Sequence, residues 1–112
     1  MAKSPIKRMQ EAELDSFAVK HTNVSGLKKE THTGTHWLEG PVEFPDGRVV
    51  YCYSEWHEHT DDPRVMVSMY ANGRYYQHQD TALVCSRESM RRLAVAFADR
   101  VAKAAKEAKD GR

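Results

Sequence analysis

The chain has 112 residues, of which 40% are hydrophobic and 29% charged, and its formal net charge is +1. This length suits one compact domain of ordinary size, and the composition is too polar for a membrane protein and too aromatic for a disordered one. The near-neutral net charge does not favour broad affinity for nucleic acid, which usually needs an excess of basic residues on one face.

No apolar run approaches the roughly 20 residues of a membrane-spanning helix, and the first residues lack the apolar region of a secretory signal. We therefore expect a cytoplasmic protein that does not associate with a membrane. In such a compartment, Cys52 and Cys85 are predicted to be reduced thiols rather than a disulfide.

The first third of the chain is predicted to hold one helix and a linker. Ser4 and Pro5 are typical of a helix start, and apolar residues then recur at helical spacing over about residues 5–19. Turn- and coil-forming residues dominate residues 20–34, which predicts a flexible linker. The sequence thus divides into an N-terminal helix with its linker, residues 1–34, and a folded domain over residues 35–112.

A β-hairpin is predicted next. Two β-like runs, residues 35–44 and 48–57, flank the turn Pro45-Asp46-Gly47, whose residues favour a three-residue loop with a glycine bulge. The first run contains Gly40-Pro41, and proline cannot donate to a ladder, so we expect an edge strand or a bulge there. The turn fixes a register that pairs Phe44 with Arg48, Val42 with Val50, and Leu38 with Ser54.

Side-chain alternation separates the two faces of this hairpin. One face is mainly apolar, and it carries Leu38, Val42, Phe44, Val50, Cys52 and Trp56. The other face is aromatic and acidic, and it carries Trp37, Glu39, Glu43, Tyr51, Tyr53, Glu55 and His57.

A second hairpin and a long helix complete the predicted elements. The run 64–70 is followed by Asn72-Gly73, the strongest short signal for a type I′ turn, so Tyr70 should face Tyr75. Residues 82–85 fit either a short fifth strand or the entry to a helix. Ser86 is a suitable N-cap, and apolar residues then repeat at helical spacing over about residues 87–109.

These elements predict an α+β fold. We expect a four-stranded antiparallel β-meander with the long C-terminal helix packed on one face, plus the N-terminal helix on its linker. One helix covers one face, so the aromatic and acidic face should remain uncovered. Two structural alternatives to a binding role exist. The N-terminal helix could cover the aromatic and acidic face, or the tyrosines of that face could be present only because tyrosine favours strands.

An uncovered face of this kind often marks an interaction site, because tyrosine and tryptophan combine a large contact area with a polar tip. Residues 35–63 hold seven acidic residues and one arginine, which suits a partner with a basic surface. We predict a non-enzymatic protein-binding module or inhibitor, such as a phage-type antagonist that blocks a basic nucleic-acid-handling target. A second copy of the chain is another candidate partner for this face. The predicted partner-binding residues are Trp37, Glu39, Glu43, Tyr51, Tyr53, Glu55, Tyr70 and Tyr75.

Nucleic acid is the first alternative partner. Sheets that stack bases pair their aromatic residues with lysine and arginine, whereas this face carries glutamates. Phosphates would instead be contacted by the basic C-terminal helix, through Arg87, Arg91, Arg92, Arg100, Lys103 and Lys106.

A small metal-dependent hydrolase is the second alternative. His57-Glu58-His59-Thr60-Asp61 resembles the H-x-H-x-D motif of metallo-β-lactamase-like hydrolases, and the resemblance implies metal ligation by His57, His59 and Asp61. The next residue is Asp62, where that motif has histidine. The chain has no glycine-rich phosphate loop, nucleophile elbow or Cys-x-x-Cys pair, so the main prediction is a protein without enzymatic activity or a cofactor.

Overall fold

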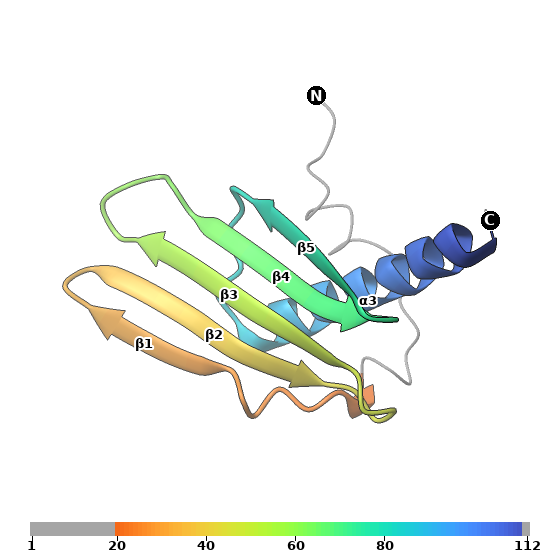
Figure 1. Ribbon diagram of the computed structural model, residues 1–112. Coiled ribbons are helices and arrows are strands. Elements are labelled where there is room, and N and C mark those ends of the chain that lie inside the picture. Colours follow the sequence, from red (N-terminus) through yellow and green to blue (C-terminus); the bar gives the residue numbers. More distant parts are fainter. Residues whose placement is uncertain (1–19, 111–112) are drawn as a thin grey trace.

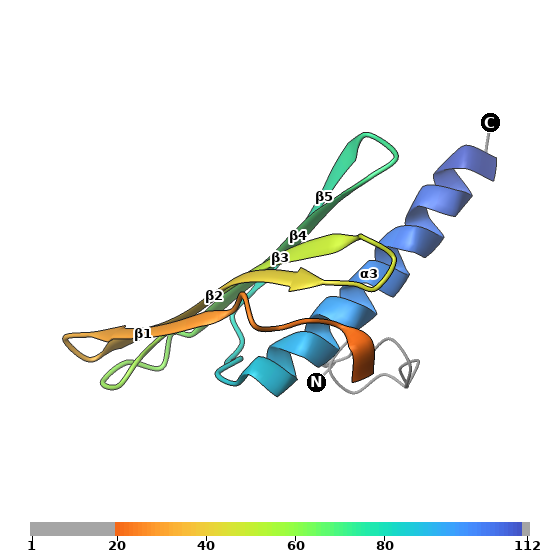
Figure 2. The same cartoon turned by 90° about the horizontal axis from the view of Figure 1, so that it is seen from below.

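The computed structural model describes residues 20–110, and the helix predicted over residues 5–19 lies outside them. The described part is an α+β fold in which an antiparallel sheet carries one long helix on one face (Figures 1 and 2). The order of the strands in the sheet is the order in the chain, β1-β2-β3-β4-β5. The elements are β1 (Lys28–His32), β2 (Thr35–Glu43), β3 (Val49–His57), β4 (Arg64–Ala71), β5 (Arg74–Asp80) and α3 (Arg87–Asp110).

The sheet has five strands, so the prediction of four was wrong. The additional strand is β1, which lies within the predicted linker and pairs with β2 from Lys28–Glu39 to His32–Thr35. Its five residues are all exposed, which explains why no apolar alternation marks it. The turn between the two strands is Thr33-Gly34, where both residues have positive φ (50° and 79°). Threonine rarely adopts this conformation, so Thr33-Gly34 is not a pair of residues that predicts a hairpin turn.

The predicted register of the next hairpin is confirmed. Val42 pairs with Val50 and Leu38 with Ser54. The Phe44 N–H donates to the Arg48 carbonyl (2.8 Å), and Gly47 takes a φ of 92°. The Asp46 carboxylate accepts a bond from the Arg48 N–H (3.0 Å), which is the local bond that favours aspartate in turns.

Strand β2 is not an edge, because it lies between β1 and β3, and its pairing with β3 runs through Gly40 and Pro41 without a bulge. The proline is tolerated because β1 ends at the partner of Glu39, so no neighbour needs the missing N–H. On that side, the backbone of Gly26 passes directly over Gly40, whose φ is 142°. The prediction of an edge strand or a bulge was therefore wrong for β2 as a whole, although β1 does not extend alongside Pro41.

The second hairpin and the helix confirm their predictions. Tyr70 pairs with Tyr75, and both turn residues, Asn72 and Gly73, have positive φ as a type I′ turn requires. Ser86 caps α3, since its Oγ accepts a bond from the Ser89 N–H (3.1 Å). Residues 82–85 form neither a strand nor a helical turn.

The core lies between the sheet and α3. The side of the sheet that faces α3 contributes the buried residues Leu38, Val42, Val50, Cys52, Val65, Val67 and Met69, and α3 contributes Met90, Leu93, Ala94, Phe97 and Val101. Burial raises the pKa of the Cys52 thiol to about 12, so it stays protonated, whereas Cys85 is exposed. Both cysteines are free.

Polar bonds tie the connecting segments to this core. The Ser54 hydroxyl, buried in β3, donates to the Val84 carbonyl (2.6 Å). At the start of α3, Arg87 Nε donates to the Leu27 carbonyl (3.0 Å) and Arg91 Nη1 to the Lys20 carbonyl (3.4 Å). The first turns of the helix are thus fixed to the segment that precedes β1. Within the described part of the chain, no helix combines the length and apolar character that crossing a membrane requires.

Candidate binding surface

We use the term open face for the side of the sheet that points away from α3. Figure 2 shows the sheet with α3 on one side only, and no element within residues 20–110 lies across the other side. Directly paired residues of neighbouring strands share a face, so the strand pairings define its membership. All eight predicted partner-binding residues lie on the open face: Trp37, Glu39, Glu43, Tyr51, Tyr53, Glu55, Tyr70 and Tyr75.

One end of the open face presents three exposed tyrosines, which we call the tyrosine cluster. Tyr51, Tyr70 and Tyr75 are 56%, 69% and 47% exposed. The rings of Tyr70 and Tyr75 lie 5.1 Å apart between centroids and are tilted by 53°. Tyr51 and Tyr70 line a shallow hollow together with the turn Asp46–Arg48. These three exposed rings offer a large contact area to a partner. This end is therefore the part of the open face best suited to binding.

The other end of the open face is a hydrogen-bonded group centred on Glu55, which we call the glutamate network. Glu55 Oε1 accepts two bonds of 2.9 Å each, one from Trp37 Nε1 and one from the Tyr53 hydroxyl. Glu55 Oε2 lies 3.5 Å from His57 Nε2, and the other ring nitrogen of His57 bonds Thr35 Oγ1 (2.9 Å). These bonds fix the orientations of both aromatic rings before any partner arrives.

The network also sets the charge of its members. The hydrogen bonds from Tyr53 and Trp37 hold the pKa of Glu55 below its ordinary value, so its carboxylate is charged at neutral pH. Burial, with the bond to Glu55, raises the pKa of the Tyr53 hydroxyl, which therefore remains a donor. Donor and acceptor states are thus matched across the network.

The lowered pKa of Glu55 predicts an acid transition in the network. A carboxylate whose pKa is lowered by folding stabilises the fold above the ordinary value of 4.5 and loses that contribution as the pH falls through the lowered value. We expect the Trp37 indole N–H resonance in NMR to move with a midpoint below pH 4.5. Glu55→Gln should abolish this step, because its amide does not titrate. A midpoint at or above the ordinary glutamate value would contradict the network.

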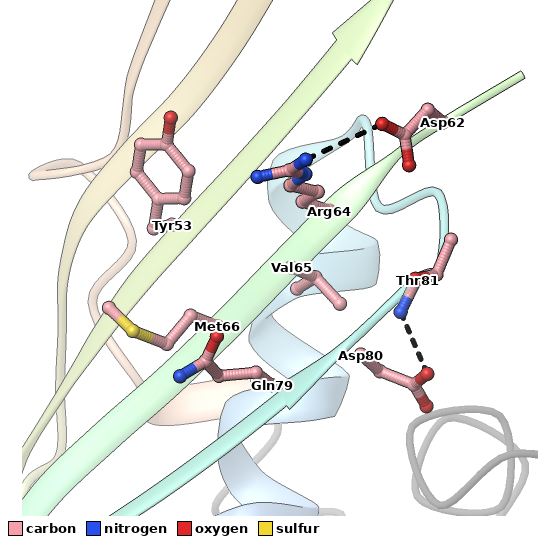
Figure 3. Close-up of a pocket in the computed structure, with 8 residues that line it drawn as sticks. All are labelled: Tyr53, Asp62, Arg64, Val65, Met66, Gln79, Asp80 and Thr81. Atoms are coloured by element: carbon pink, nitrogen blue, oxygen red, sulfur yellow. Dashed lines mark hydrogen bonds and ion pairs between the residues drawn. The ribbon is translucent and has the colours of Figure 1, made fainter.

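The structure adds cations to the open face. Lys28 of β1 pairs with Glu39, and Arg64 of β4 pairs with Glu55. Arg64 Nη2 also lies 3.6 Å from the Asp62 carboxylate, at one end of a hollow that Tyr53 and Met66 help to line (Figure 3). The face is therefore less acidic than residues 35–63 alone suggest. Lys28 was missed because β1 was missed.

The basic residues of the nucleic-acid alternative do not form one free surface. Arg87 and Arg91 bond backbone carbonyls of the segment before β1, and Arg91 Nε also lies 3.4 Å from Glu88. The others are exposed on α3: Arg92, Arg100, Lys103 and Lys106. Two of the six predicted contacts thus hold the fold together.

The residues of the metal alternative are not brought together as a ligand set. His57 ends β3 within the glutamate network, whereas His59 and Asp61 lie in the connection to β4. Another nearby histidine, His36, stacks on Trp56 and bonds Glu58 (2.8 Å). Across residues 20–110, no group of three or more histidine, cysteine or acidic side chains is arranged to hold a metal ion.

Comparison with known proteins adds no assignment. No family model matches the chain, and neither the curated proteins nor the solved structures gave a match. The function of the chain is therefore inferred from the open face.

Proposed function

We propose that the chain is a non-enzymatic protein-binding module that holds its partner on the open face. The observation that carries this proposal is the exposure of the tyrosine cluster, with Tyr70 at 69% and Tyr51 at 56%. Tyrosines are enriched among the residues that dominate binding energy at protein interfaces. The neighbouring glutamate network supplies a rigid, charged border whose side chains lose little conformational freedom on binding.

The charges of the face favour a partner with a basic surface. The open face carries Glu30, Glu39, Glu43 and Glu55 against Lys28 and Arg64. An excess of carboxylates speeds the encounter with a cationic surface and opposes the approach of phosphates. A more specific form of the proposal is an inhibitor that occupies a basic groove of its target.

The test is to remove rings from the tyrosine cluster. Tyr51→Ser combined with Tyr70→Ser should reduce partner retention on immobilised protein by about tenfold or more, since large interface rings are often hot spots. Partners retained from the native host are identified and quantified by mass spectrometry. Leu83→Ser is the matched control, because Leu83 is 54% exposed in the connection between β5 and α3, and we expect unchanged retention.

Other results would reject the proposal. Equal retention by the double variant, with an unchanged far-UV circular dichroism spectrum, would exclude the tyrosine cluster as the binding surface. Retention of nucleic acid that falls steeply with salt and survives in the double variant would favour the exposed cations of α3 instead. A second copy of this chain as the retained species would make the open face a homodimer interface.

A further inference from the structure

Within residues 20–110, β5 is an edge strand of the sheet, and its only charged residues, Arg74 and Asp80, lie at its two ends. One side of it pairs with β4 along its whole length, and within residues 20–110 no strand pairs with the other side (Figure 1). Proteins usually protect such edges with lysine, proline, bulges or very short strands. The opposite edge, β1, has only five residues and includes Lys28 and Lys29. Strand β5 has seven residues, no lysine, no proline and a regular register.

The turn before β5 determines which of its backbone groups are free. In a hairpin with a two-residue loop, the residues that flank the loop, here Ala71 and Arg74, exchange both backbone hydrogen bonds. Bonding then alternates along the strand. The residues whose N–H and C=O groups point away from β4 are Tyr75, Gln77 and Gln79.

The sequence of β5, Arg-Tyr-Tyr-Gln-His-Gln-Asp, is complementary to itself in the antiparallel sense. When two copies align about Gln77, Arg74 of each lies opposite Asp80 of the other. The same alignment brings the outward-pointing groups of Tyr75 opposite those of Gln79, and Gln77 opposite itself. This alignment overlaps the full length of the strand, so backbone pairing and charge pairing favour the same register.

We propose that two copies of this chain associate through antiparallel pairing of their β5 strands, with a two-fold axis at Gln77. The product is a continuous sheet of ten strands, twice the five of one copy, with an isologous interface. This interface lies along the β5 edge. It leaves Tyr51 and Tyr70 of the tyrosine cluster available for a different partner, whereas Tyr75 belongs to β5 and takes part in the pairing.

The first test removes a backbone donor at the axis. The Gln77 N–H points away from β4, so Gln77→Pro should preserve the hairpin while blocking the pairing of two copies. Sedimentation velocity should show the unmodified chain as a dimer at about 100 µM and the variant with a dimer dissociation constant raised by about tenfold or more. The far-UV circular dichroism spectrum checks that the variant is folded.

The second test examines the register and does not depend on a proline. Arg74→Asp and Asp80→Arg each place like charges opposite one another, and each should raise the dissociation constant about tenfold. The two substitutions together place opposite charges across the interface again, so dimerisation should be restored. An unmodified chain that remains a monomer, or a dimer that single reversals do not weaken, would overturn the proposal. A dimer that persists in Gln77→Pro but is lost in Tyr51→Ser with Tyr70→Ser would instead place the interface on the open face.

Discussion

Phe97→Ala should lower the free energy of unfolding by about 3–5 kcal/mol, the usual cost of removing a buried aromatic ring. Phe97 is only 5% exposed and belongs to the cluster that joins α3 to the sheet. A loss of this size is a large part of the roughly 5–15 kcal/mol that stabilises a typical domain. Chemical denaturation, followed by circular dichroism, would measure it.

Leu83→Ala is a suitable control for this prediction. Leu83 is also a large apolar side chain, but it is 54% exposed and lies outside the core cluster, so its loss should cost well under about 1 kcal/mol. If the two variants had the same stability, Phe97 would not be a core residue and the packing of α3 on the sheet would be wrong.

Gly40→Ala should cost about 3 kcal/mol or more of folding stability, because it combines backbone strain with a steric overlap. Gly40 has a φ of 142°, which favours glycine. A Cβ atom there would overlap the carbonyl oxygen of Gly26, which is backbone and cannot rotate away. We expect the segment before β1 to be displaced from β2, and the thermal unfolding midpoint to fall.

Gly47→Ala separates the two causes. Gly47 also has a positive φ (92°), but nothing lies within 4 Å of the position that its Cβ would take. This substitution should cost only the backbone strain of about 1–2 kcal/mol. Equal losses at the two positions would mean that the chain does not cross closely at Gly40.

The sequence predicts those parts of the fold that are marked by characteristic turn residues or by a regular spacing of buried apolar residues. The turns at Pro45-Asp46-Gly47 and Asn72-Gly73 set correct registers, because their residues suit the required φ values. The helix after Ser86 was recognised because its apolar residues meet the sheet at every turn. Strand β1 was missed because both its faces are exposed, so its side chains carry no alternation.

The sequence predicts which residues lie on the open face, but it does not predict the hydrogen bonds among them. Alternation from the correct register places Trp37 and Tyr53 on one face. It cannot show that both side chains donate to the same oxygen of Glu55, because that depends on side-chain rotamers. Alternation therefore does not distinguish the hydrogen-bonded rings from the exposed rings, such as that of Tyr70.

The bonds from Arg87 and Arg91 to the carbonyls of Leu27 and Lys20 have a consequence for synthesis. The five strands are synthesised before α3. The apolar side of the sheet is therefore exposed until α3 has left the ribosome and can pack on it. The two guanidinium groups then join stretches that are 60 and 71 residues apart. Closure of such long loops is slow, and we expect the nascent sheet to be most prone to aggregation in the interval before α3 emerges.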